Sequence, residues 1–139
     1  MSFLLDTNVV SELRKGPRTH PNVVRWFSEI GDEALHLSVL VVGELRQGVE
    51  RLRVRDKESA RHLDCWLERL ARGYAGSILP IDEPVAALWG RLNVPSPLPA
   101  VDGLLAATAL VHDLTLVTRN GRHVTRTGVR VLNPFERRG

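Results

Sequence analysis

The chain has 139 residues, of which 43% are hydrophobic and 25% are charged, proportions typical of a globular domain with one core. Its apolar runs fall short of the roughly 18 residues that cross a bilayer, and no basic stretch precedes an apolar core at the N-terminus. Cys65 is the only cysteine, which excludes an internal disulfide framework. We therefore expect a single domain over residues 1–139 in a cytoplasmic protein with no membrane association.

The charge balance points towards an anionic partner. The formal net charge is +3, and six arginines against one acid, Glu136, follow position 118. A second basic cluster comprises Arg51, Arg53, Arg55 and Lys57. Such clusters fit either an ordinary solvated surface or nucleic-acid binding.

Hydrophobic periodicity predicts strands that alternate with helices. In chain order, strands are expected at 2–7, 34–38, 77–81, 115–119 and 129–133. Helices are expected at 8–15, 21–31, 39–54, 57–72, 83–94 and 101–113, with Asp56 as an N-cap and a rigid proline-rich connector at 95–100. This alternation predicts an α/β fold with a mainly parallel central sheet of about four to five short strands, flanked by helices.

Three acids occupy unexpected positions in this pattern. Asp6 ends the first apolar strand, on the side of a parallel sheet where ligands bind. Glu44 lies at the edge of an apolar helical stripe, and Asp102 opens a helix that is otherwise apolar. Each has an ordinary alternative: Asp6 and Asp102 as helix caps, and Glu44 as the ion-pair partner of Arg46 or Arg51. If the three converge, their mutual repulsion calls for a cation, and Mg²⁺ or Mn²⁺ suits such oxygen ligands.

At these residues the sequence resembles the PIN-domain family, and specifically the VapC-type toxins of bacterial type II toxin–antitoxin systems in the FitB-like branch. The resemblance covers nearly the whole chain, through LLDTNVVSEL, LSVLVVGELRQGV and LPAVDGLLAATALVHDLTLVTRN. It implies a metal-dependent endoribonuclease whose catalytic acids Asp6, Glu44 and Asp102 hold one or two Mg²⁺ or Mn²⁺ ions. It also implies a homodimer and a small antitoxin protein as the partner.

One position departs from the family pattern. The family commonly has a fourth acid where this chain has His123. A histidine there would be a nitrogen ligand, which suits Mn²⁺ better than Mg²⁺. Alternatively, Asn120-Gly121 is simply a tight turn and His123 a surface residue.

Further residues have expected roles around these acids. Asn8, Thr118 and Asn120 would orient water, metal ligands or the turn, and Arg119, Arg122 and Arg126 would contact RNA phosphates. tRNA and rRNA are the candidate substrates. A catalytically weakened PIN domain that binds RNA or an antitoxin is the alternative function. The sequence has no Walker loop and no GxGxxG motif, so nucleotide hydrolysis and dinucleotide redox chemistry lack their phosphate-binding loops.

Overall fold

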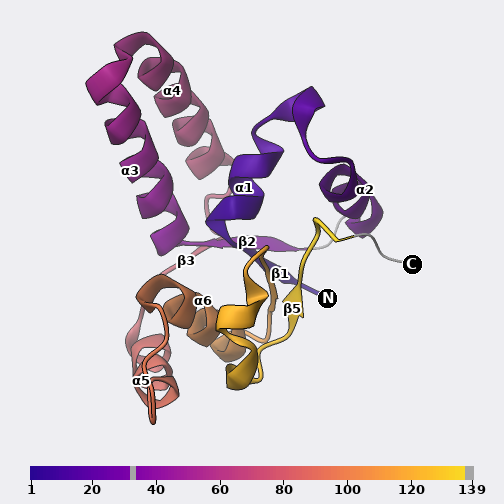
Figure 1. Cartoon of the computed structure of the whole chain (residues 1–139), viewed down its shortest axis with the longest axis vertical. Coiled ribbons are helices and arrows are strands. Elements are labelled where there is room, and N and C mark those ends of the chain that lie inside the picture. The colour runs from indigo at the N-terminus through magenta and orange to yellow at the C-terminus, as the bar shows by residue number, and fades with distance from the viewer. Residues whose placement is uncertain (32–33, 137–139) are drawn as a thin grey trace.

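Five short parallel strands form one sheet in the order β3-β2-β1-β4-β5, with β1 at its centre (Figure 1). The computed structural model describes residues 1–31 and 34–136. The elements in chain order are β1 (Phe3–Leu5), α1 (Thr7–Leu13), η1 (Gly16–Arg18), α2 (Pro21–Ile30), β2 (Leu35–Ser38), α3 (Val39–Arg55), α4 (Lys57–Gly73), β3 (Ile78–Leu79), α5 (Glu83–Leu92), α6 (Ala100–Val111), β4 (Thr115–Val117), η2 (Gly121–His123), η3 (Thr125–Thr127) and β5 (Val131–Leu132).

The predicted α/β fold with a parallel sheet is confirmed. β1 is buried along its whole length because helices cover both faces of the sheet, which is why its sequence is continuously apolar rather than alternating. Phe3 pairs with Leu35 of β2 on one side and with Thr115 of β4 on the other. Asp6, the first of the three acids, therefore directly follows the central strand of the sheet.

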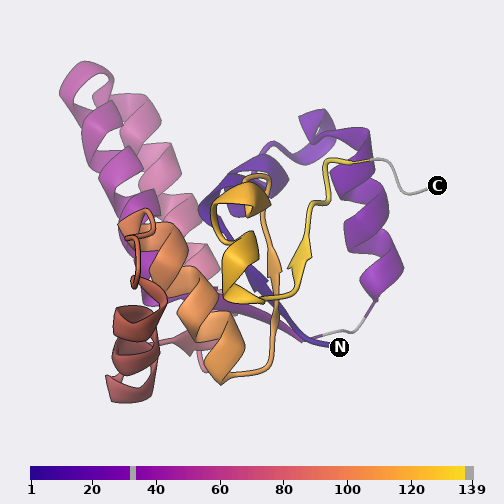
Figure 2. The same cartoon turned by 60° about the horizontal axis from the view of Figure 1, so that its bottom comes forward.

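Two layers of helices enclose the sheet. Figure 1 shows α1 and α2 on one side of it and α5 and α6 on the other. In Figure 2, which turns the molecule by 60°, the short turns after β4 again lie beside α6, as they do in Figure 1. The helix that carries the third acid thus lies next to the turns that follow β4.

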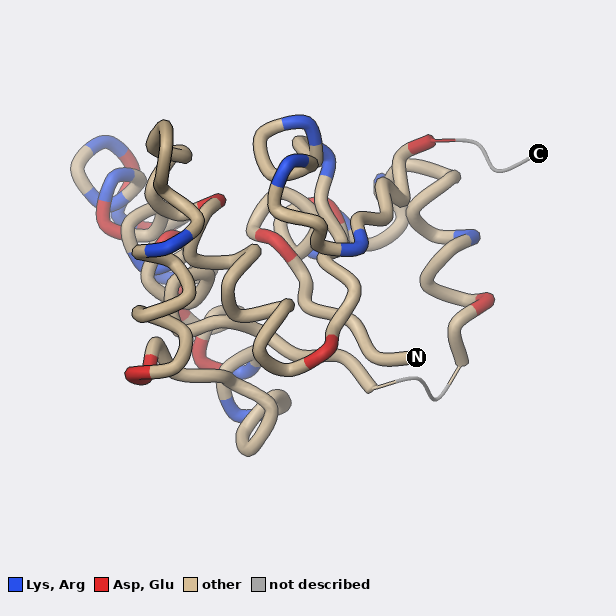
Figure 3. Tube along the Cα trace, turned by 90° about the horizontal axis from the view of Figure 1, so that it is seen from below, with Lys and Arg blue, Asp and Glu red and all other residues tan. Residues whose placement is uncertain are grey.

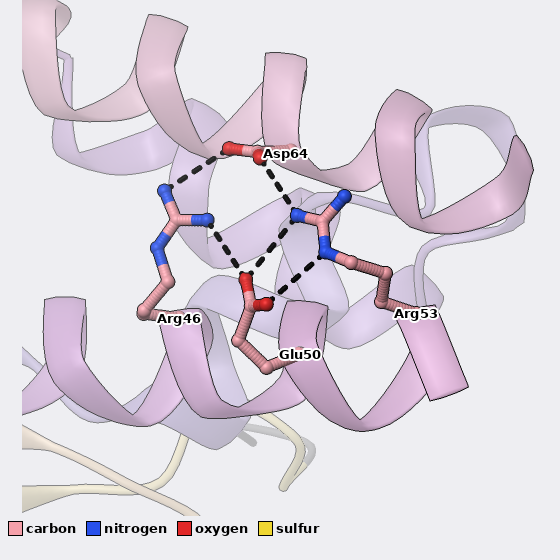
Figure 4. A network of polar contacts seen from close by, with 4 residues as sticks. All are labelled: Arg46, Glu50, Arg53 and Asp64. Atoms are coloured by element: carbon pink, nitrogen blue, oxygen red, sulfur yellow. Dashed lines mark hydrogen bonds and ion pairs between the residues drawn. The ribbon is translucent and has the colours of Figure 1, made fainter. Parts of the chain in front are cut away.

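Helices α3 and α4 form a hairpin that projects from the body of the molecule (Figure 1). Asp56 ends α3 and caps α4, because its carboxylate accepts a hydrogen bond from the backbone N–H of Ser59 at 3.1 Å; this cap was predicted. Further along the hairpin, Asp64 of α4 contacts the guanidinium groups of Arg46 and Arg53 of α3, each at 3.0 Å (Figure 4). Glu50 also contacts both arginines, so this ionic network ties the two helices together.

Several local expectations need correction. The last long helix begins at Ala100, with Pro99 as its N-cap residue, so it starts earlier than predicted. Asn120-Gly121 does not form a simple tight turn, since a 3₁₀ helix begins at Gly121. Of the three tryptophans, Trp26 is buried, whereas Trp66 and Trp89 are half-buried. Among the described residues, no helix is both long and apolar enough to span a membrane.

Candidate functional site

Asp6 is a buried carboxylate at the carboxyl end of the central strand. Its backbone N–H continues the ladder to Val117 of β4 at 2.9 Å, and its Oδ1 accepts from the backbone N–H of Thr7 at 2.7 Å. Asp6 is therefore the N-cap of α1, which confirms the expectation that it could act as a helix cap. Its second oxygen, Oδ2, accepts from the hydroxyl of Thr118 at 2.6 Å and from the amide of Asn8 at 3.4 Å. Capping therefore uses only one of the two carboxylate oxygens.

Glu44 reaches the same region from the second turn of α3. This helix starts directly after β2, where the Ser38 hydroxyl accepts from the backbone N–H of Leu40 at 3.0 Å. Glu44 Oε1 accepts from the hydroxyl of Thr7 at 2.5 Å, and Thr7 is the residue next to Asp6. The alternative of an ion pair with Arg46 is wrong, because Arg46 pairs with Glu50 and Asp64. The Thr7 contact was not predicted, and no local sequence signal indicates it.

Asp102 lies in the first turn of α6, close to the other two acids. The expectation that it caps this helix is wrong, because Pro99 is the N-cap residue and α6 has no side-chain cap. Burial raises the pKa of the Asp102 carboxyl above its ordinary value, and the negative charge of Asp6 raises this pKa further. The charge of Glu44 acts in the same direction. The charges of two acids from other elements thus both act on Asp102.

His123 lies in the 3₁₀ helix η2. Its positive charge lowers the pKa of Asp102 and so partly opposes the two acids, although the imidazole itself is solvent-exposed.

Of the neighbouring polar residues, Asn8 donates to Thr118 Oγ1 at 3.5 Å, and the backbone N–H of Asn120 donates to the same oxygen at 3.1 Å. Asn120 therefore contacts the site through its backbone. Asp113 lies at the opposite end of β4, where it pairs with Arg130.

The donor set fits a divalent cation that keeps much of its own water. Within residues 1–31 and 34–136, no three His, Cys, Asp or Glu side chains are grouped tightly enough to surround an ion by themselves. The three carboxylates nevertheless supply hard oxygen atoms, and the repulsion that Asp102 experiences from Asp6 and Glu44 is the kind that a cation relieves. Mg²⁺ commonly binds through one or two carboxylates and retains several waters, so it does not need a closed protein cage.

Three arginines lie on the segment that follows β4 and Thr118. Figure 3 shows a group of basic positions on the loops at the top of its view. Arg119 and Arg122 are exposed, and the guanidinium of Arg119 lies 4.4 Å from the centroid of the Phe135 ring. Arg126 is also exposed, and it donates a hydrogen bond to the backbone carbonyl of Ser96 in the proline-rich connector. The contact between Phe135 and Arg119 was not predicted, because no spacing in the sequence relates the two residues.

Known proteins show the same architecture over the same length. The sequence model of the PIN domain family matches residues 3–128 of this chain. Toxin FitB of Neisseria gonorrhoeae is 38% identical, with 96% of this chain and 98% of that protein aligned. The VapC ribonuclease Y4jK of Sinorhizobium fredii is 30% identical over 96% of this chain and 98% of its own length. A solved structure of FitAB bound to an IR36 DNA fragment superposes with a TM-score of 0.87 at 34% identity, covering 99% of this chain and 98% of that one. The chain belongs to the PIN-domain family, in the FitB-like branch of its VapC-type toxins.

Proposed function

We propose that this protein is the metal-dependent endoribonuclease toxin of a toxin–antitoxin pair. One observation carries the proposal: Asp102 is partly buried where the charges of Asp6 and Glu44 both act on it. A fold has no structural need for three converging carboxylates, since their repulsion destabilises it. A hydrolase that binds a cation at this point does need them.

Asp6, Glu44 and Asp102 would hold Mg²⁺ or Mn²⁺, with His123 as an additional nitrogen ligand. When bound, such an ion polarises a phosphate and lowers the pKa of an attacking water. The imidazole at position 123 favours Mn²⁺ relative to a fourth carboxylate, because it is a softer ligand and brings no negative charge.

The surrounding polar side chains orient the carboxylates. The hydroxyl of Thr118 and the amide of Asn8 both donate to Oδ2 of Asp6, which fixes the direction in which its lone pairs point. The hydroxyl of Thr7 does the same for Glu44. Asn120 supports this arrangement by donating from its backbone to Thr118.

Arg119, Arg122 and Arg126 supply positive charge for RNA phosphates beside the acids. Contacts of this kind give affinity that depends on salt and not on sequence. Selectivity among candidate substrates such as tRNA and rRNA then comes from the shape of the RNA and from its unpaired loops. Arg126 contributes least, because its guanidinium already donates to Ser96.

A small antitoxin protein and a second copy of the chain are the proposed protein partners. The family relationship supports the antitoxin, since FitB carries the name of a toxin and FitAB was solved as a DNA-bound assembly. The second copy is proposed from the family resemblance alone. We place the protein in the cytoplasm, where its RNA substrates are found.

A binding module without catalysis is the second candidate. Two features favour it: the acids do not form a closed ligand set among the described residues, and a histidine occupies position 123. On this alternative the protein would bind RNA or the antitoxin without cutting.

The test is cleavage of total RNA by antitoxin-free protein with EDTA, Mg²⁺ or Mn²⁺. Asp6→Asn is the matched variant, because asparagine still caps α1 while one carboxylate is lost. We expect discrete fragments that require metal and are absent with the variant. Intact RNA in every lane, from folded protein that still binds RNA, would support the binding module.

A further inference from the structure

Arg119 is attached to the acidic site through its backbone, and its side chain extends from there. It follows Thr118 directly, and its N–H donates to Oδ1 of Asn8 at 3.2 Å. The same Asn8 side chain donates to Asp6. The backbone of Arg119 is thus fixed beside the first acid, whereas its long side chain would be free to rotate unless something held it.

The ring of Phe135 holds that side chain. The Arg119 guanidinium carbon lies 4.4 Å from the ring centroid, within the distance at which a cation is attracted to an aromatic face. Phe135 comes from the segment after β5, so the contact joins two parts of the chain that follow different strands of the sheet.

Phe135 is itself firmly placed. It is 9% exposed, its backbone N–H donates to Oδ1 of Asn133 at 3.0 Å, and its carbonyl accepts from the Asn22 amide of α2 at 2.7 Å. The ring of His20 packs against it edge-on, with 5.8 Å between centroids. Because the ring is nearly covered, it cannot serve as a stacking platform for an RNA base; its available function is to support the arginine.

We propose that Phe135 is a positioning residue: it holds the guanidinium of Arg119, whose backbone adjoins the acidic site, in place for contact with an RNA phosphate. A guanidinium stacked through one face keeps the N–H groups at its edge available for phosphate oxygens. Holding the side chain in advance removes part of the conformational entropy that RNA binding would otherwise cost. The proposal rests on the proposed RNA substrate, and it concerns binding rather than the cleavage step.

The test is a double-mutant cycle measured as RNA affinity. Four proteins are compared, all carrying Asp6→Asn so that the probe stays intact: the parent, Phe135→Leu, Arg119→Gln, and both changes together. Fluorescence anisotropy with a labelled single-stranded oligoribonucleotide in Mg²⁺ gives each Kd. Leucine keeps an apolar side chain over Asn22 and His20 but removes the aromatic face. Thermal unfolding of each variant reports any general loss of structure.

We expect Phe135→Leu to weaken RNA binding about two- to fivefold, the factor that corresponds to an exposed cation–π contact of about 0.5–1 kcal/mol. In the Arg119→Gln background the same change should have no effect. Phe135→Tyr should restore the parent affinity, because a tyrosine ring also attracts a guanidinium.

The control is Arg14→Gln. Arg14 also stacks on an aromatic ring, that of Trp66 at 5.8 Å, but it lies at the far end of α1 from Asp6. Its loss should change RNA affinity less than the loss of Arg119 does.

An equal effect of Phe135→Leu in both backgrounds would show a merely structural role and overturn the proposal. A parent protein that binds no RNA would overturn the proposed function together with this inference. A wild-type protein that binds RNA without cutting it would contradict the nuclease function alone.

Discussion

The hydroxyl of Thr118 donates a hydrogen bond of 2.6 Å to Oδ2 of Asp6, joining two residues 112 positions apart in the chain. Thr118 is 2% exposed, so water cannot replace the hydroxyl if it is removed. The bond exists because β1 and β4 are parallel neighbours whose carboxyl ends meet at one edge of the sheet.

Thr118→Val should therefore impair the site while keeping the shape of the side chain. Losing a residue that orients a metal ligand typically costs about 10- to 100-fold in metal affinity or activity. The measurement is the Mg²⁺ concentration that gives half-maximal RNA cleavage. Thr118→Ser keeps the hydroxyl and is the control. Equal metal requirements for the valine and serine variants would contradict the orienting role.

Asp102→Asn should stabilise the metal-free protein and abolish cleavage. The pKa of Asp102 is raised in the folded state by burial and by Asp6, so the folded protein keeps this proton to higher pH than the unfolded chain. The free energy of unfolding therefore falls as the pH rises from the ordinary value of 3.8 through the raised one. Asparagine removes this penalty at neutral pH.

Thermal unfolding in EDTA at neutral pH measures the stabilisation, and the cleavage rate should fall by more than about 100-fold, beyond the loss typical of an outer-shell residue. Leu104→Met, a change of similar volume on the same helix, controls for the effect of any substitution in α6. An Asp102→Asn variant that melts at a lower temperature than the wild-type protein would show that the three acids do not destabilise the empty site.

Glu12 should make the protein sensitive to acid. It is 8% exposed, accepts from the Lys15 ammonium at 3.0 Å, and accepts from the backbone N–H of His20 at 2.9 Å. These bonds lower the pKa of Glu12, so its contribution to stability is present above pH 4.5 and is lost as the pH falls below that value through the lowered pKa.

Glu12→Ala should lower the free energy of unfolding at neutral pH by about 1–2 kcal/mol, mainly because the N–H of His20 loses its partner. Urea unfolding at neutral pH and at acid pH measures this loss. Glu12→Gln keeps an acceptor for that N–H without the charge, so it should cost less and weaken the dependence on acid. A glutamine variant with the wild-type pH profile would assign the acid sensitivity to another group.

Gly103 lets α5 and α6 pack closely beside the third acid. A Cβ at this position would lie 3.2 Å from Cβ of Leu98 and 3.2 Å from Cδ1 of Trp89. Gly103→Ala should therefore cost about 1–3 kcal/mol from overpacking, only partly offset by the better helix propensity of alanine. Gly90→Ala on α5 is the matched control, since a Cβ there meets nothing within 4 Å.

The control variant should gain up to about 1 kcal/mol from helix propensity alone. Chemical denaturation of both variants gives the comparison. Similar stabilisation by the two alanines would mean that Trp89 moves aside at little cost.

The sequence predicts the elements well because their signals are local. The apolar run at Phe3–Leu5, the cap at Asp56 and the alternation of strands with helices each depend on neighbouring residues. The position of Asp6 also follows from a general rule, since ligands of parallel sheets bind at the carboxyl ends of the strands.

The partners of the site residues could not be predicted, because they lie far away in the chain. Thr7 meets Glu44 across 37 positions, and Arg119 meets Phe135 from a different strand. The role of Asp102 was left open for a different reason: Asp102 is a favourable N-cap residue by type, yet Pro99 is the N-cap residue of α6 and the helix begins at Ala100, one residue before the expected start. An acid in the first turn of a helix gains from the helix dipole without capping it.

The order of the strands also decides when the acidic site is completed during synthesis. Asp6 and Glu44 lie in the first third of the chain, whereas Asp102 and Thr118 lie in the last third. β1 pairs with β2 on one side, but its other side has no partner until the ribosome has added β4. A growing chain therefore emerges with two acids, without the third and without the hydroxyl that holds Asp6. On the proposed mechanism, the set of metal ligands is complete only when the last third of the chain has been made.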